Sequence, residues 1–65
     1  MRLIVNGEDH ELEALTLTDA MALLEYEGGW LATAVNGELV HREDRSDCRL
    51  VEGDRIEILA PKQGG

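Results

Sequence analysis

The sequence predicts an α+β fold in which one main helix packs across one face of a mixed sheet of about four to five strands. Two observations lead to this fold class. Only one segment has the apolar spacing of an amphipathic helix, and several short β-branched or alternating segments are joined by Asn-Gly turns. A helix of about ten residues is too short to persist alone, so it must cover the apolar side of the sheet.

The N-terminal segment predicts a β-hairpin. Residues 2–6 are mostly aliphatic and are followed by Asn6-Gly7, a dipeptide that adopts positive φ at little cost and is the strongest short-range hairpin signal. Residues 10–15 alternate roughly, with Leu12 and Ala14 on one face and glutamates on the other. We therefore expect a second, antiparallel strand there, with one face in water.

Thr16 is expected to begin the helix. Its hydroxyl can accept a hydrogen bond from the amide of Asp19, whose carboxylate can reach back, in a Thr-x-x-Asp form of the capping box. The apolar residues at helical spacing share one face: Leu17, Ala20, Met21 and Leu24. Gly28-Gly29 offers a left-handed stop after the helix.

The second half of the chain predicts another hairpin. Residues 31–35 form a third apolar run, Asn36-Gly37 is a second hairpin turn, and Leu39-Val40 begins the strand after it. Residues 41–49 are polar and predict an irregular loop with a short turn. Leu50-Val51 predicts a brief pairing segment.

The last strand is expected at residues 55–59, after a turn at residues 52–54. Ile56 and Ile58 then share one face, and Leu59 lies on the other with the charged residues. Because a sheet this small needs its middle covered, we expect this strand beside the first, in a β-grasp-like arrangement. Pro61 ends the strand because it cannot donate a ladder hydrogen bond.

The chain is expected to form one domain, residues 1–61, followed by a flexible C-terminal tail, residues 62–65, which has nothing apolar to bury. It has 65 residues, with 14 Asp and Glu against 6 Lys and Arg and a net charge of −8. This charge argues against nucleic-acid and anionic-membrane partners and favours partners with basic surfaces. No run approaches the roughly 18 apolar residues of a membrane span.

No residue group predicts catalysis or a bound metal. His10, His41 and Cys48 are too far apart in sequence to suggest a zinc site. The chain has no nucleophile and base at a plausible spacing, no phosphate loop and little room for a pocket, so we expect that it is not an enzyme.

The remaining unusual residues have ordinary interpretations. The single cysteine, Cys48, permits no internal disulfide and is expected to be a small, partly buried residue. A free cysteine without an export signal suggests the cytoplasm. Tyr26 and Trp30 are expected to pack at the edge of the core.

The C-terminal residues suggest a function. Gly64-Gly65 follows Pro61, and two residues without side chains can pass through a narrow channel that any Cβ would block. The unhindered carboxylate can be activated by ATP as an acyl-adenylate, which sulfur or an amine then attacks. Leu59 and Lys62, at the root of the tail, are the expected contact surface for a partner.

Five segments of the chain stand in a distinctive order and spacing. They are VNG at 5–7, TLTDAM at 16–21, AVNGELV at 34–40 with Arg42, EGDRIEILAP at 52–61 and QGG at 63–65. Together they resemble the bacterial ThiS sulfur carriers of thiamine biosynthesis, which are small ubiquitin-like β-grasp proteins. The resemblance covers nearly the whole chain.

The resemblance implies a mechanism in which the enzymes are the partners. A ThiF-type adenylyltransferase would adenylate the Gly65 carboxylate with ATP and magnesium. A sulfur donor system would convert it to a thiocarboxylate, and a ThiG-type thiazole synthase would receive the sulfur. Gly65 is then the modified residue, Gly64 and Gln63 lie in the partner's channel, and the chain itself binds no cofactor.

Alternatives stay open at this point. One is a related β-grasp carrier such as the small subunit of molybdopterin synthase, and another is a ubiquitin-like modifier or interaction domain in which Gly65 joins a lysine or stays inert. The chain also departs from the family. His41 stands where members commonly have Pro, and residues 43–49 are unusually charged where an aromatic residue is often found.

Overall fold

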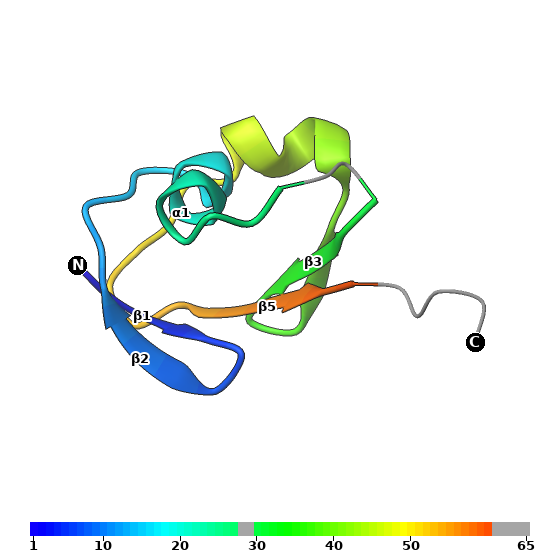
Figure 1. Ribbon diagram of the computed structural model, residues 1–65. Coiled ribbons are helices and arrows are strands. Elements are labelled where there is room, and N and C mark those ends of the chain that lie inside the picture. The colour runs from blue at the N-terminus through cyan, green and yellow to red at the C-terminus, as the bar shows by residue number, and fades with distance from the viewer. Residues whose placement is uncertain (28–29, 61–65) are drawn as a thin grey trace.

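The computed structural model describes residues 1–27 and 30–60 (Figure 1). The elements follow in the order β1 (Arg2–Val5), β2 (Glu8–Glu11), α1 (Leu17–Leu23), β3 (Ala32–Val35), β4 (Glu38–Val40), the 3₁₀ helix η1 (Arg42–Asp47) and β5 (Arg55–Leu59). The strands form one five-stranded sheet in the order β2-β1-β5-β3-β4. The predicted mixed sheet with one main helix is therefore confirmed.

β5 lies at the centre of the sheet. It runs parallel to β1 and antiparallel to β3, while the outer strands β2 and β4 pair antiparallel with β1 and β3. The expectation that the last strand returns beside the first is confirmed. Both β5 neighbours belong to hairpins, so the central strand is enclosed by local structure from the two halves of the chain.

The core lies between the sheet and α1, which together with η1 covers a single face of it (Figure 1). Alternating side chains of the central strands are buried, with Leu3 and Val5 from β1 and Ile56 and Ile58 from β5. The helix contributes Leu17, Ala20 and Met21. Among the described residues no helix is long and apolar enough to cross a membrane.

Both Asn-Gly turns form as predicted. Asn6 and Asn36 have φ of 50° and 52°, and the following Gly7 and Gly37 have φ of 84° and 85°. Two successive positive φ values define the type I′ turn, whose twist matches the twist of the paired strands. Only Asn, Asp and Gly adopt this backbone readily, which is why the dipeptides located the hairpins correctly.

The second strand is shifted from its predicted position. The prediction placed it at residues 10–15, whereas β2 spans Glu8–Glu11 and is solvated on nearly all positions. A two-residue turn puts Glu8 directly opposite Val5, so pairing begins at once and ends opposite Arg2. The alternation from Leu12 to Ala14 lies beyond the end of the partner strand and leads into the helix.

The helix begins at the predicted capping box. The Thr16 hydroxyl accepts from the Asp19 amide at 3.2 Å, and the Asp19 carboxylate accepts from the Thr16 amide at 3.3 Å. The helix ends earlier than predicted. Glu25 has φ of 63°, and the amides of Glu25 and Tyr26 bond to Ala22 and Met21, which is a Schellman motif with Glu in place of Gly. Gly28-Gly29, the predicted stop, lies outside the described residues.

Removing the capping hydroxyl should therefore cost measurable stability. Thr16→Ala is expected to lower the free energy of unfolding by about 1 kcal/mol, because the Asp19 amide loses its acceptor. Thr18→Ala is the matched control, since Thr18 is exposed two residues later, in the first turn of the helix, and is not the N-cap. Urea unfolding of both variants measures the difference, and equal losses would contradict the capping account.

The charged loop is better ordered than the sequence indicates. Residues 41–49 were expected to be irregular, yet Arg42–Asp47 form η1, and Arg45 is 6% exposed. The Arg45 Nε donates to the Thr33 hydroxyl at 2.9 Å, and Nη2 donates to the Leu31 carbonyl. These bonds satisfy a buried guanidinium within a segment whose polar residues predict an irregular loop.

The brief pairing segment expected at Leu50-Val51 is partly correct. Thr16 and Arg49 form an isolated antiparallel bridge, and the Leu50 amide donates to the Leu15 carbonyl at 2.9 Å. Leu50 is buried, but Val51 is 62% exposed. The segment therefore holds the start of the helix against the loop.

Candidate functional site

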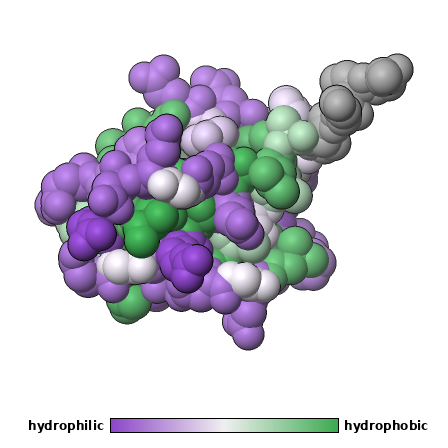
Figure 2. Space-filling model, turned by 90° about the horizontal axis from the view of Figure 1, so that it is seen from below, coloured by the Kyte–Doolittle hydropathy of each residue, from purple (hydrophilic) through white to green (hydrophobic). Residues whose placement is uncertain are grey.

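The face of the sheet opposite α1 is open to solvent in the described structure (Figure 2). Alternation along β5 places Ile56 and Ile58 in the core and Arg55, Glu57 and Leu59 on this open face. Figure 2 shows hydrophobic surface there in separate patches among hydrophilic side chains. The open face is therefore the part of the sheet that can meet another molecule.

Leu59 lies on the open face as predicted and is 62% exposed. The register sets it opposite Ala32 on β3, and Ala34, the next residue on the same face, lies opposite Leu39. Leu39 is 65% exposed. These four residues, Ala32, Ala34, Leu39 and Leu59, form what we call the open-face patch, an apolar surface at the end of β5 that leads into residue 60.

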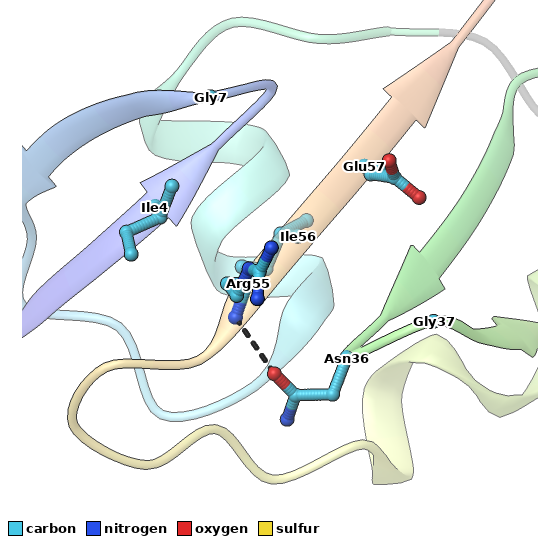
Figure 3. A pocket seen from close by; sticks show the side chains of 7 residues that line it. All are labelled: Ile4, Gly7, Asn36, Gly37, Arg55, Ile56 and Glu57. Atoms are coloured by element: carbon cyan, nitrogen blue, oxygen red, sulfur yellow. Dashed lines mark hydrogen bonds between the residues drawn. The ribbon is translucent and has the colours of Figure 1, made fainter.

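A depression lies beside this patch, across the middle of β5 (Figure 3). It has a volume of about 730 Å³ and lies between the two hairpin turns. Its lining residues are Ile4, Gly7, Asn36, Gly37, Arg55, Ile56 and Glu57. The expectation that so small a chain leaves little room for a pocket is corrected, because Gly7 and Gly37 line the depression and have no side chains to fill it.

The charges on the open face are unevenly paired. Arg2 of β1 lies 3.4 Å from the Asp9 carboxylate of β2. Arg55, in the depression, has no ion-pair partner within 4.0 Å among the residues that the structure describes. Its backbone amide donates to the Asn36 side-chain oxygen at 3.0 Å, as Figure 3 shows. The Arg55 guanidinium is therefore an exposed positive charge on the open face of a chain whose net charge is −8.

Cys48 is half-buried, as expected. Burial raises the pKa of its thiol, and the Asp54 carboxylate adds to this shift. A raised pKa keeps the sulfur protonated at neutral pH, which makes it a poor nucleophile. The geometry does not favour a sulfur-handling role for this side chain.

The other candidate residues also remain apart. The His10 Nε2 lies 3.9 Å from a Glu8 oxygen, and the described residues contain no group of three or more possible metal ligands. Tyr26 packs half-buried against the core as expected, but Trp30 is 57% exposed, so its predicted place at the core edge is wrong.

The remaining predicted site residues, Lys62, Gln63, Gly64 and Gly65, lie outside the described residues, as does Pro61. The structure does show where they begin. Ala60 follows Leu59 directly, at the end of the central strand and next to the open-face patch. The described chain therefore leaves the sheet beside the open-face patch.

Comparison with known proteins gives a consistent result. The model of the ThiS family matches residues 3–65. None of the functionally curated proteins compared with this chain matches it significantly.

Two solved structures are similar over the whole chain. One is the crystal structure of a thiamine biosynthesis protein, ThiS, from Geobacter metallireducens, 28% identical, with a TM-score of 0.85 and full coverage of both chains. The other is a solution structure of a thiamine biosynthesis protein from the same organism, 28% identical, with a TM-score of 0.81 over all of this chain and 88% of that one. The ubiquitin-like β-grasp fold is thereby confirmed.

Proposed function

The chain belongs to the ThiS family, the small sulfur carriers of thiamine biosynthesis, and on this premise we propose that it transports sulfur as a thiocarboxylate on Gly65. The family match covers residues 3–65 and so includes Gly64 and Gly65. That observation supports the proposal more than any other, because the chemistry needs only a terminal carboxylate and room around it. The folded domain then provides the surface that the partner enzymes recognise.

The proposed loading takes two steps on a partner adenylyltransferase, which uses ATP and magnesium. A Gly65 carboxylate oxygen attacks the α-phosphorus of ATP, and pyrophosphate leaves with the electrons of the broken P–O bond. Hydrosulfide from a sulfur donor system then attacks the acyl carbon, and AMP leaves as the C–O bond breaks. The product is a thiocarboxylate, and no electrons are gained or lost.

Delivery is proposed to a thiazole synthase. The thiocarboxylate sulfur is a good nucleophile, and Gly64 and Gly65 have no side chain to block a narrow entrance. Gln63 and Lys62 lie between this end and the domain. No residue of the chain acts as acid, base or metal ligand in this scheme. We place the reaction in the cytoplasm, in keeping with the unpaired Cys48.

Intact-mass measurement tests the proposal. Incubation of the chain with a ThiF-type adenylyltransferase, magnesium ATP and sulfide should raise its mass by about 16 Da, as one carboxylate oxygen is replaced by sulfur. Co-purification with a thiazole synthase would support the thiamine pathway. Co-purification with the large subunit of molybdopterin synthase, or a series of lysine adducts, would instead favour the alternatives.

The open-face patch is the surface we expect both partners to contact. It is apolar, exposed and adjacent to the residue from which the tail begins, so docking there places the tail near the partner's active site. Beyond it, the sheet edge at β2 exposes the carboxylates of Glu8, Asp9 and Glu11. A partner that combines an apolar centre with basic residues at its rim would complement this surface.

A charge placed in the patch should weaken docking. Leu59→Glu is expected to lower kcat/KM for adenylation at least tenfold, because the carboxylate must lose water when the interface forms. Leu23→Glu is the matched control, since Leu23 is also exposed, at 55%, but lies on the helix. Kinetics at fixed partner concentration measure both variants. Equal effects, or none at Leu59, would contradict the assignment of the docking face.

A further inference from the structure

The side chain of Asn6 holds the C-terminal part of β5 where the backbone of β1 no longer can. The parallel ladder ends with the Asn6 amide donating to the Ile56 carbonyl at 2.9 Å, after which β1 turns away at Asn6. The Asn6 amide group then continues the ladder. Its oxygen accepts from the Ile58 amide at 2.9 Å, and its nitrogen donates to the Ile58 carbonyl at 3.1 Å.

These two bonds occupy both backbone groups of Ile58 on the β1 side of β5. Without them the amide and carbonyl would have only water as a partner, and the last residues of the strand would be held from the β3 side alone. A primary amide presents an N–H donor and a C=O acceptor side by side, as a peptide group does. The position also requires positive φ, which Asn tolerates.

The same nitrogen is tied to the end of the helix. It lies 3.2 Å from the Tyr26 hydroxyl oxygen, which accepts its second hydrogen. Tyr26 is fixed in turn by its backbone bond to Met21 and by packing against the core. The first hairpin turn, the helix end and the last strand therefore meet at a single side chain.

Asn36 occupies the equivalent place in the second hairpin and holds the opposite end of β5. Its oxygen accepts from the Arg55 amide at 3.0 Å, and its nitrogen donates to the Asp54 carboxylate at 2.9 Å. The two asparagines share residue type, turn type and nearly equal φ. They differ in that Asn6 acts next to the exit of the tail, whereas Asn36 acts where β5 begins.

We propose that Asn6 is a positioning residue for the carried terminus. By fixing Ile58 it sets the direction in which the chain continues through Leu59 and Ala60, the residues from which the carried terminus must reach the partner's nucleotide. This inference rests on the proposed function. The position of the Gly65 carboxylate matters in this reaction, because the attacking oxygen must be in line with the P–O bond that breaks. A misplacement of about 1 Å can lower the rate a hundredfold.

The test compares Asn6→Gly with Asn36→Gly. Glycine keeps the left-handed backbone of both turns and removes only the side-chain bonds. With a ThiF-type adenylyltransferase and magnesium ATP, single-turnover pyrophosphate release is followed against carrier concentration. Asn6→Gly should lower the rate at saturation about tenfold or more and leave the half-saturating concentration within about twofold, because the docking face is intact. Asn36→Gly should keep both values within about twofold of the original chain.

Tyr26→Phe provides a second, milder variant in case Asn6→Gly fails to fold. It removes only the hydroxyl that accepts from Asn6, and a loss in the saturating rate of about two- to fivefold is expected, with no change in half-saturation. Amide hydrogen exchange gives a readout without the partner. Exchange at Ile58 should accelerate in Asn6→Gly and Tyr26→Phe but not in Asn36→Gly.

Equal rates for Asn6→Gly and Asn36→Gly would overturn the inference, and so would a defect confined to half-saturation or unchanged exchange at Ile58. If Asn6→Gly does not fold, an unchanged rate at saturation in Tyr26→Phe would overturn the inference. Failure of the original chain to release pyrophosphate with an active partner would count against the proposed function instead.

Discussion

A chain that lacks Gly65 is expected to lose sulfur loading completely while its fold is unchanged. Deletion moves the terminal carboxylate back by one residue, about 3.5 Å, which is more than in-line attack on the α-phosphorus tolerates. Within the part of the chain that the structure describes, the core extends from Leu3 to Ile58, so the free energy of unfolding should change by no more than about 0.5 kcal/mol. Intact mass after incubation with partner, magnesium ATP and sulfide measures the loading.

The deletion has two contradicting outcomes. A mass increase that persists without Gly65 would mean that sulfur is attached elsewhere on the chain. A large loss of stability would mean that the terminus is part of the folded structure, and the loss of loading would then have a trivial cause. Leu23→Glu, which leaves the terminus intact, is the positive control for sulfur loading under the same conditions.

Arg45→Ala is expected to produce the largest loss of stability of any single change discussed for this domain. The substitution leaves a cavity under η1. It also removes the two N–H groups that donate to the Thr33 hydroxyl and the Leu31 carbonyl. The expected loss is about 2–4 kcal/mol, against a total of about 3–10 kcal/mol for a chain of this size. The melting temperature should fall by about 10–20 °C.

Arg42→Ala is the matched control, because Arg42 lies on the same 3₁₀ helix and is exposed. It should change the free energy of unfolding by less than about 0.5 kcal/mol. Arg45→Met keeps the apolar stem but not the donors, so its stability should fall between those of the original chain and Arg45→Ala. If Arg45→Ala unfolds like Arg42→Ala, the buried guanidinium does not stabilise the loop as described.

The sequence predicted best where one residue type has a unique physical use. The Asn-Gly turns, the Thr16–Asp19 capping box and the alternation of β5 were all located correctly. Each depends on contacts within about four residues, so neighbouring sequence contains the whole argument. The place of the last strand beside the first followed from the need to cover the middle of a small sheet, which is a property of the chain's size.

The errors share a different cause. The start of β2 depends on pairing with β1, and the end of α1 depends on a left-handed Glu25, a residue with no marked preference for that backbone. Arg45 is buried although its neighbours are charged, because acceptors from β3 and the preceding segment reach it. Such tertiary partners are not visible in local sequence.

The candidate site was predictable in part. Leu59 could be placed on the open face because alternation in a strand is strict. Leu39, its companion in the patch, and the bonds of Asn6 to Ile58 were missed, because they join segments that are distant in sequence. An Asn before Gly signals a turn, and nothing local distinguishes one whose amide group also holds another strand.

Fragment mass spectrometry of the loaded chain locates the sulfur. Cleavage after Glu57 releases residues 58–65 as one peptide, and Cys48 stays in a different fragment. The thiocarboxylate account predicts an added mass of about 16 Da on the peptide 58–65, assigned by its smallest C-terminal fragment to Gly65. An unmodified terminal peptide together with about 32 Da on the fragment that contains Cys48, the signature of a persulfide, would contradict it.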